Sequence, residues 1–421
     1  MRVQHIVIVC VIALLIITSV LYAQSEIIAI KGGTFLTIHD GILKNAVLLI
    51  QDGKISALGN DVQIPAGTHV INSTGKTITP GFIDCFTNLG IADLPSFGTD
   101  DVESTSPITP QLRVIDALNP DNRFLSIARA AGITTAVCAP GEANLLSGQS
   151  AIIRLAGTTI EEMTLTFPSG IHGSLGEAPK KRFGANEQAP MTRMGSAAML
   201  RQTFLDVQEY LSKIKTYKKK LTEYKNDKNS EGKEPAAPEK DLKLQALIPV
   251  LKREIPCIIS ASRMDDILTA LRIADEFNID IILNHGIEAY RIADKLAARN
   301  IPVIIGPTTL HFQTQETLRA KGENAYLLHQ AGVKIAFQTG SIKNVSGLLH
   351  EAKKAAEYGL PREEALKALT LYPAQIFHVD KQLGSLEVGK SADIVLFDAD
   401  PIQENSSVKM VLIQGKIVFQ N

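Results

Sequence analysis

Short apolar runs separated by turn residues fill residues 26–79 and return at the end of the chain. The first part contains "IIAIKGGTFLTI", "AVLLIQDGKISALG" and "THVINSTGKTITP", and the last contains "SADIVLFDADP" and "VKMVLIQGKIVFQN". Gly32-Gly33 and Asp52-Gly53 are dipeptides typical of tight hairpin turns. The pattern predicts a small antiparallel sheet at each end. We expect residues 24–79 and 379–421 to combine into one composite β-sandwich domain.

Between these ends, nearly continuous apolar runs alternate with amphipathic stretches. The runs "GITTAVCAP", "IPCIISAS", "IDIILNHG", "IPVIIGP" and "VKIAFQTG" are short and rich in β-branched residues, as strands buried on both faces of a parallel sheet are. Stretches such as "MDDILTALRIADEFN" and "SGLLHEAKKAAEYG" place apolar residues three and four apart, which is typical of helices. Repeated units of this kind predict an α/β fold, a (β/α)8 TIM-like barrel over residues 80–378. Its functional residues are expected at the carboxyl ends of the strands.

Residues 205–245 depart from this alternation. A Lys/Glu-rich helical stretch, "LDVQEYLSKIKTYKKKLTEYKNDKNSEG", leads into a loop that contains proline and alanine. Charges of mixed sign are typical of a solvent-facing helix and a connecting loop, so we predict an insertion in the barrel. A binding surface built from its lysines is the alternative.

The first residues have the organisation of a secretory signal. Arg2 provides a positive charge, residues 6–21 are uncharged and mostly apolar, and Leu21-Tyr22-Ala23 offers a cleavage point. We therefore predict a signal peptide over residues 1–23 and a secreted or periplasmic protein with no stable membrane span after cleavage. An uncleaved membrane anchor is the alternative, although the apolar stretch is shorter than the roughly 20 residues that span a bilayer.

Charge and cysteine content narrow the range of partners and chemistry. The 421 residues carry a net charge of −1, so no overall field attracts nucleic acid, and none is expected as a partner. Cys85, Cys138 and Cys257 each lie in or beside an apolar run. We expect buried thiols rather than a disulfide framework or a redox site.

Six stretches spread along the chain carry a family resemblance. They are "TPGFID" from Thr79, "APGEANLLSGQSAIIRLAG" from Ala139, "LGEAPKK" from Leu175, "TRMG" from Thr192, "GLPREEALKALTLYPAQIF" from Gly359 and "LGSLEVGKSADIVLFDADP" from Leu383. Together they resemble the metal-dependent amidohydrolase superfamily, specifically its secreted, imidazolonepropionase-like branch. The resemblance implies hydrolysis of a C–N bond in an amide, cyclic amide or peptide-like substrate. The water that attacks would be activated by one or two divalent metal ions.

The same resemblance implies a set of metal ligands that this chain mostly lacks. Members carry a His-x-His pair at the end of the first barrel strand, a histidine after the fifth, another after the sixth and an aspartate after the eighth. The corresponding residues here are Phe86, Asn88, Ser260, His285 and Gly340. Phenylalanine has no donor atom, neutral oxygens are poor ligands for Zn²⁺, and glycine removes the balancing negative charge. Of the five expected positions, His285 alone keeps its ligand.

His172 adds a second imidazole, because it aligns with a lysine that bridges two metals in some members. Two imidazoles make a weak site. We therefore expect no metal, or a weakly bound divalent ion such as Zn²⁺ held by His172 and His285, with His285 as the one retained catalytic position. Ser147 in "LLSGQ" has no histidine and aspartate at a recognisable spacing, so we interpret it as a loop serine rather than a nucleophile.

Three functions are compatible with these patterns. The favoured one is a weakly active or inactive amidohydrolase-family protein that binds a small amide or peptide-like ligand, or acts as a partner subunit of an active amidohydrolase relative. The alternatives are an active C–N bond hydrolase with a reorganised metal site and a secreted structural scaffold. The first is favoured because the barrel and sheet patterns are clear while the ligands are missing.

Overall fold

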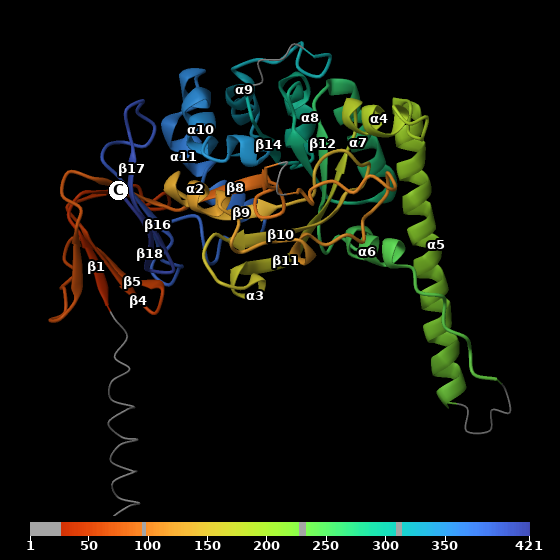
Figure 1. Cartoon of the computed structure of the whole chain (residues 1–421), viewed down its shortest axis with the longest axis horizontal. Coiled ribbons are helices and arrows are strands. Elements are labelled where there is room, and N and C mark those ends of the chain that lie inside the picture. Colours follow the sequence, from red (N-terminus) through yellow and green to blue (C-terminus); the bar gives the residue numbers. More distant parts are fainter. Residues whose placement is uncertain (1–26, 95–97, 227–232, 309–313) are drawn as a thin grey trace, which may run out of the picture.

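The computed structural model describes residues 27–94, 98–226, 233–308 and 314–421, and the predicted signal peptide lies outside them. Figure 1 shows a sheet-rich domain at one end, a barrel surrounded by helices in the middle, and one long helix along the other end. The fold class predicted from the sequence is confirmed: an eight-stranded barrel sheet carries an additional domain of two smaller sheets.

Strands from both ends of the chain build the two smaller sheets. The four-stranded sheet has the order β5-β4-β1-β6, and the six-stranded sheet has the order β18-β17-β16-β7-β2-β3. The strands of the first are β1 (Ile28–Lys31), β4 (Val47–Gln51), β5 (Lys54–Gly59) and β6 (His69–Asn72). Those of the second are β2 (Thr34–Leu36), β3 (Ile42–Lys44), β7 (Thr77–Pro80), β16 (Ile394–Phe397), β17 (Val408–Ile413) and β18 (Lys416–Gln420). Ile394 lies opposite Pro80, so the two ends of the chain share one sheet.

One of the two predicted hairpins forms. Asp52-Gly53 joins β4 to β5 with positive φ at both residues, as a two-residue hairpin turn requires. The hairpin expected at Gly32-Gly33 is wrong, because these glycines carry the chain from one sheet into the other. β1 pairs with β4 and β6, whereas β2 pairs with β3 and β7. The β1–β6 and β2–β7 pairs are parallel, so the domain is not purely antiparallel.

Eight strands follow one another around the barrel in chain order. They are β8 (Phe82–Thr87), β9 (Ile133–Cys138), β10 (Gly148–Arg154), β11 (Thr164–Ser174), β12 (Cys257–Ala261), β13 (Ile281–His285), β14 (Val303–Ile305) and β15 (Ile335–Phe337). β10 runs antiparallel to both of its neighbours, and the other paired strands are parallel. The link from β9 to β10 is too short for a crossover helix, so β10 must run back beside β9.

The ladder of the described strands runs from β15 to β8 without closing, and other hydrogen bonds join the two edges. The amide of Gly340 donates to the carbonyl of Phe86 at 3.1 Å. The amide of Thr339 donates to the buried carboxylate of Asp84 at 3.0 Å, and the Thr339 hydroxyl donates to the same carboxylate at 2.5 Å. A side chain at this edge therefore replaces part of the missing ladder.

Helices lie on the outside of the barrel and form much of the chain that connects its strands (Figure 1). The α-helices are α2 (Phe124–Ala130), α3 (Ile160–Met163), α4 (Glu177–Gly184), α5 (Arg193–Asn226), α6 (Leu242–Leu251), α7 (Met264–Phe277), α8 (Ala293–Ala298), α9 (Asn324–Gln330), α10 (Leu348–Glu357), α11 (Arg362–Lys367) and α12 (Leu371–Ile376). Three 3-10 helices add η2 (Val114–Asp116), η3 (Ala289–Ile292) and η4 (Ile342–Asn344). α5 begins before the predicted insertion at residues 205–245 and forms most of it.

The barrel interior is apolar below its mouth. Ile83, Ile258, Ile282 and Ile304 from four strands pack together with Ala374 of α12. Ser260 and Asn284 follow Ile258 and Ile282 by two residues, towards the carboxyl ends of β12 and β13. Cys85, Cys138 and Cys257 are free and buried, as expected, and burial raises the pKa of the Cys257 thiol to about 12.

Candidate functional site

The carboxyl ends of the barrel strands gather the residues that the sequence singled out. Ser260, the second-last residue of β12, lies opposite Asn284, and Ala261 lies opposite His285, so β12 and β13 present adjacent polar groups. Across the barrel, the rings of Phe86 and His172 are 5.3 Å apart between centroids. All of these side chains lie at the same end of the barrel, where the predicted fold places function.

A carboxylate that the sequence did not single out lies at the centre of this group. Glu142, from the loop after β9, has its carboxylate oxygens 2.7 and 2.8 Å from Nε2 of His285. The Ser260 hydroxyl also donates to Glu142, and the Asn284 amide donates to it at 3.2 Å and to Ser260 Oγ at 2.9 Å. We call Glu142 and His285 the inner pair.

The other side of the His285 ring is also fixed. Its Nδ1 donates to the carbonyl of Gly306 at 2.9 Å, and the Gln338 amide donates to the same carbonyl at 2.7 Å. The Gln338 amide nitrogen also lies 3.3 Å from Nδ1 of His285, which is farther than the Gly306 carbonyl. The nearest neighbour of each ring nitrogen is therefore an acceptor, and this arrangement favours the doubly protonated imidazolium. The inner pair is therefore an ion pair whose geometry is set from both sides.

Charge and burial act in opposite directions on the inner pair. Burial disfavours the charge of Glu142, but the charge and hydrogen bond of His285 outweigh it and hold the pKa of the Glu142 carboxyl below its usual range. Burial likewise disfavours protonation of His285, but the Glu142 charge and hydrogen bond raise the pKa of the imidazole. The side chains keep 29% and 17% of their surface exposed, so a ligand at the mouth can reach both.

The second predicted imidazole is in a different state. His172 is buried, and burial lowers its pKa to about 3, so the ring is neutral. Among the described residues, neither of its ring nitrogens has a hydrogen-bond partner. The side chain of Phe86, itself 2% exposed, fills the space beside it where the resemblance expected a metal ligand.

The two remaining expected ligand positions have structural roles. The Asn88 amide nitrogen donates to Asp101 at 2.8 Å, and its oxygen accepts from the amide of Ile342 at 2.9 Å. Gly340 has a φ of +74°, and a Cβ added there would lie 2.9 Å from Cδ of Pro307. Asn88 is therefore engaged at both ends, and position 340 has a backbone that disfavours any side chain.

The donor groups do not fit a divalent metal ion. Within the described parts of the chain there is no cluster of three or more histidine, cysteine, aspartate or glutamate side chains able to hold one. His285 gives its outward nitrogen to Glu142, and Phe86 lies against His172. The metal-ligand role of His172 and His285 stays a prediction, and these contacts do not favour it.

Several buried polar atoms around the mouth have no partner among the described residues. They are both ring nitrogens of His172, Oγ of Ser174, Oδ1 of Asn284 and Oγ1 of Thr87. Buried polar groups are almost always hydrogen-bonded, so atoms of this kind mark a place for water or a polar ligand. A separate cavity of about 330 Å³ opens beside His285, which lines it together with Thr308 and Phe337 among others, but the residues with these unpartnered atoms do not line it.

Among the described residues of the site, neither Ser147 nor Ser260 donates a hydrogen bond to a histidine side chain that could activate it. Ser260 donates its proton to Glu142 rather than to His285, and a carboxylate with a lowered pKa is a weak base. Ser147 donates to the backbone carbonyl of His172 at 3.2 Å, which agrees with its interpretation as a loop serine. The described residues of the site present polar groups that can bind and orient a polar molecule.

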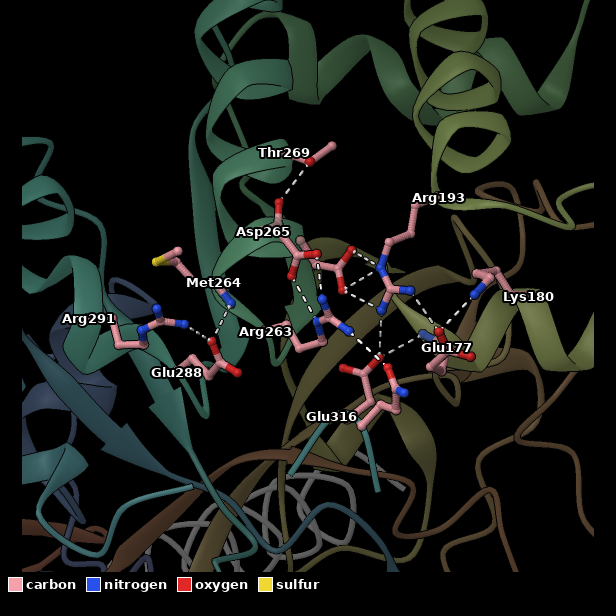
Figure 2. Close-up of polar contacts among 12 residues, drawn as sticks. Glu177, Lys180, Arg193, Arg263, Met264, Asp265, Thr269, Glu288, Arg291 and Glu316 are labelled. Carbon is pink, nitrogen blue, oxygen red and sulfur yellow. Dashed lines mark hydrogen bonds and ion pairs between the residues drawn. The ribbon is translucent and has the colours of Figure 1, made fainter. Parts of the chain in front are cut away.

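A second charged cluster joins segments that follow β11, β12 and β14 (Figure 2). The guanidinium of Arg193 donates to Asp266 at 2.9 Å, to Glu177 at 2.7 Å and to Glu316 at 3.2 Å. Lys180 adds a further contact to Glu177 at 2.7 Å. We call Arg193, Glu177, Asp266 and Glu316 the outer cluster.

The outer cluster ties together segments that are far apart in the sequence. Glu177 begins α4 directly after β11, Asp266 lies in the first turn of α7 after β12, and Arg193 begins α5. Glu316 follows β14, and burial together with the charge of Asp266 raises the pKa of its carboxyl. Three of these residues come from the stretches "LGEAPKK", "TRMG" and "SASRMDDI". Those stretches therefore meet in one structural junction.

Comparisons with known proteins place this geometry in context. A sequence model of the amidohydrolase family matches residues 261–418. The crystal structure of an amidohydrolase from Thermotoga maritima MSB8 is 33% identical, covering 94% of this chain and 100% of that one with a TM-score of 0.84.

Two curated proteins are more distant. Amidohydrolase tasK of Hapsidospora irregularis is 24% identical over 395 residues, which is 89% of this chain, and the chain spans 40% of that protein's length. Imidazolonepropionase of Geobacillus sp. (strain WCH70) is 23% identical over 397 residues, 85% of this chain and 84% of that protein.

Proposed function

The chain belongs to the amidohydrolase family, and from that premise we propose that it binds a small amide or peptide-like ligand at the barrel mouth and hydrolyses it weakly or not at all. The family is generally metal-dependent, and its chemistry needs a hydroxide made at the metal. The residues that would hold the metal here are replaced or engaged with other groups.

The observation that carries the proposal is the inner pair. His285 is the one imidazole retained at an expected ligand position, and its Nε2 lies 2.8 Å from a carboxylate oxygen of Glu142. A positive imidazolium beside a negative carboxylate gives the site a balanced charge without a divalent ion. To bind a metal, His285 would have to lose a proton and leave Glu142, which opposes metal binding.

The unpartnered atoms around the pair support an amide as the ligand. An amide presents one acceptor and, unless fully substituted, at least one donor. Asn284 Oδ1 is an acceptor, neutral His172 offers one donor and one acceptor, and the Ser174 hydroxyl can do either. A ligand with both kinds of group would satisfy them together, which a purely apolar molecule cannot do.

Metal content and turnover test the loss of hydrolysis. The purified protein is expected to hold far less than one equivalent of zinc, manganese or iron by elemental analysis, and to show no turnover of dipeptides and cyclic amides above background. The His285→Ala variant is the matched control. Stoichiometric metal together with turnover, both abolished by that substitution, would establish the reorganised hydrolase instead.

Calorimetry with the same compounds tests binding. Ser174→Ala removes a hydroxyl without a partner among the described residues, so it should leave stability nearly unchanged. It should weaken ligand binding about fivefold, which corresponds to the free energy of roughly one hydrogen bond. The matched control is Ser169→Ala on the same strand, whose hydroxyl lies 2.8 Å from Ser150 Oγ. Equal affinities for the two variants would place the ligand elsewhere, and no binding by any compound would contradict the proposal.

A further inference from the structure

The long helix α5 has two unlike halves. Its buried residues all lie before Leu211, and they are Ser196, Ala197, Leu200, Phe204, Val207 and Tyr210. From Leu211 to Asn226 no residue is buried, and Figure 1 shows this part of the helix extending beyond the body of the protein. We call residues 211–226 the arm.

The arm is amphipathic. Ile214, Tyr217, Leu221 and Tyr224 are half-buried, while most of the residues between them are exposed. Their spacing of three and four residues places them on one side of the helix. This apolar stripe therefore continues past the point where the barrel stops covering α5.

The arm is also strongly basic. It contains six lysines and one acidic residue, Glu223, whereas the whole chain has a net charge of −1. Lys213 directly precedes Ile214, and Lys220 directly precedes Leu221. Lys218 directly follows Tyr217, and Lys225 directly follows Tyr224. One residue is a rotation of about 100° around a helix, so these four lysines border the stripe on both sides.

Few carboxylates neutralise these lysines. Lys213 lies 2.7 Å from Glu209 and Lys219 lies 3.8 Å from Glu223, both one helical turn away. Within the described residues, the other four lysines of the arm form no ion pair. The positive charge is therefore available to an external partner.

We propose that the arm docks on an anionic membrane surface, with the stripe in the interfacial region and the bordering lysines beside the headgroups. A helix with an apolar face, lysines on both sides of it and low overall hydrophobicity is suited to lie in that region. Tyrosine side chains favour the same boundary, because one end is apolar and the other polar. No helix in the described residues is long and apolar enough to cross a bilayer, so the arm would lie on the surface.

Charge argues against a second copy of the chain as the occupant. Two arms packed side by side would bring two sets of lysines together, and the repulsion would oppose pairing. An acidic protein would satisfy the charge, but flanking lysines on both sides of a tyrosine-bearing stripe fit a flat anionic surface better than a single acidic patch.

Vesicle co-sedimentation of the full chain tests the proposal. Wild-type protein should bind vesicles of phosphatidylcholine with roughly one-third phosphatidylglycerol more tightly than pure phosphatidylcholine vesicles, and added salt should weaken the binding. The arm variant Lys213→Glu/Lys218→Glu/Lys220→Glu/Lys225→Glu should have a partition coefficient on the anionic vesicles at least about tenfold lower than wild type. Each lysine near such a surface contributes about 1 kcal/mol to binding. The matched control reverses four exposed lysines on the body, Lys44, Lys54, Lys181 and Lys381.

Three results would overturn the proposal. One is equal binding of the wild type to the two kinds of vesicle, and another is equal loss in the arm and body variants. The third is a dimer in light scattering that the arm variant dissolves, which would make a second copy the occupant. The double variant Tyr217→Ser/Leu221→Ser should also bind more weakly than wild type, because a helix in the interface must bury that stripe. Circular dichroism confirms that each variant is folded.

Discussion

The inner pair and the outer cluster lie at the same end of the barrel and are both charged, yet they relate to the sequence in opposite ways. Two residues of the outer cluster, Glu177 and Arg193, come from stretches that carry the family resemblance, and the cluster joins α4, α5, α7 and the segment that holds Glu316. The inner pair occupies the place of the family's metal chemistry, and four of the five positions expected to bind metal have lost their ligands. The comparison indicates that the junction around the mouth does not depend on the chemistry inside it.

The largest expected effect is on the outer cluster. Arg193→Met would leave three carboxylates facing one another, with the Asp266 side chain only 4% exposed. Removing one partner of a buried ion pair typically destabilises a protein by about 3 kcal/mol or more. Urea denaturation at neutral pH measures the difference in free energy of unfolding.

The matched control is on the same helix. Arg201 lies 2.6 Å from Glu276, but both side chains are more than a third exposed. Arg201→Met should therefore change the free energy of unfolding by less than about 1 kcal/mol. Equal effects of the two substitutions would show that the outer cluster is not the junction we describe.

The next effect concerns the buried carboxyl of Asp84, which joins β8 to the residues that follow β15. Burial raises the pKa of Asp84 from 3.8 to about 7, although hydrogen bonds from Thr339 oppose the shift. The folded state therefore keeps a proton that the unfolded chain loses, so stability falls as pH rises between about 4 and 7. Asp84→Asn should remove this loss. The free energy of unfolding of the variant relative to the wild type should therefore rise by roughly 2–3 kcal/mol between pH 5 and pH 8.

Denaturation curves of wild type and Asp84→Asn at several pH values provide the measurement. Other buried carboxyls with raised pKa values, such as Glu351 and Asp393, titrate in both proteins and cancel in the difference. A difference that does not change with pH would mean that Asp84 is ionised in the folded protein, and that Thr339 is enough to hold the charge at the barrel seam.

How far the sequence predicted the molecule depends on the range of the interactions involved. The barrel, the composite sheets and the buried cysteines were predictable, because local periodicity and the family resemblance carry that information. The direction of β10 was not, since it depends on the length of one link, and the Gly32-Gly33 turn was misread because two sheets meet there. Periodicity reports local structure and not which distant strand becomes the neighbour.

For the site, the sequence predicted only which expected metal-ligand positions lack their ligands. Phe86, Asn88, Ser260 and Gly340 could be identified as replaced positions, but the replacement partner, Glu142, comes from a different loop. A charged residue directly after a predicted barrel strand was the available signal, because the strand ends converge at the mouth. The contact of Glu142 with His285 is a tertiary contact, and residue spacing in the sequence does not predict it.

The inner pair itself can be tested by titration. Glu142→Gln should lower the pKa of His285, because the carboxylate charge and its hydrogen bond to the imidazole are removed. The pair's stabilisation is lost as pH falls through the lowered pKa of Glu142 and as it rises through the raised pKa of His285. Wild type and variant should therefore differ most in stability between those two pKa values.

Proton NMR of the His285 ring measures the shift directly. Glu316→Gln is the control, because Glu316 also raises the pKa of His285, but as the smallest of the named contributions. The expected order is a larger fall for Glu142→Gln than for Glu316→Gln. The reverse order would mean that Glu316 of the outer cluster, rather than Glu142, mainly stabilises protonated His285. The inner pair and the outer cluster would then not be separate electrostatic units.

The smallest effect tests whether the backbone also excludes the missing aspartate. Gly340→Ala adds a Cβ at a φ of +74° and 2.9 Å from Pro307, whereas Gly332→Ala adds one at a φ of +83° with nothing within 4 Å. Both variants bear the conformational penalty of roughly 1 kcal/mol, and only the first adds a clash. Urea denaturation should therefore find Gly340→Ala the less stable of the two. Equal stabilities would mean that an aspartate can return to position 340 without moving the backbone, and that the inner region lost its ligands through side-chain replacement alone.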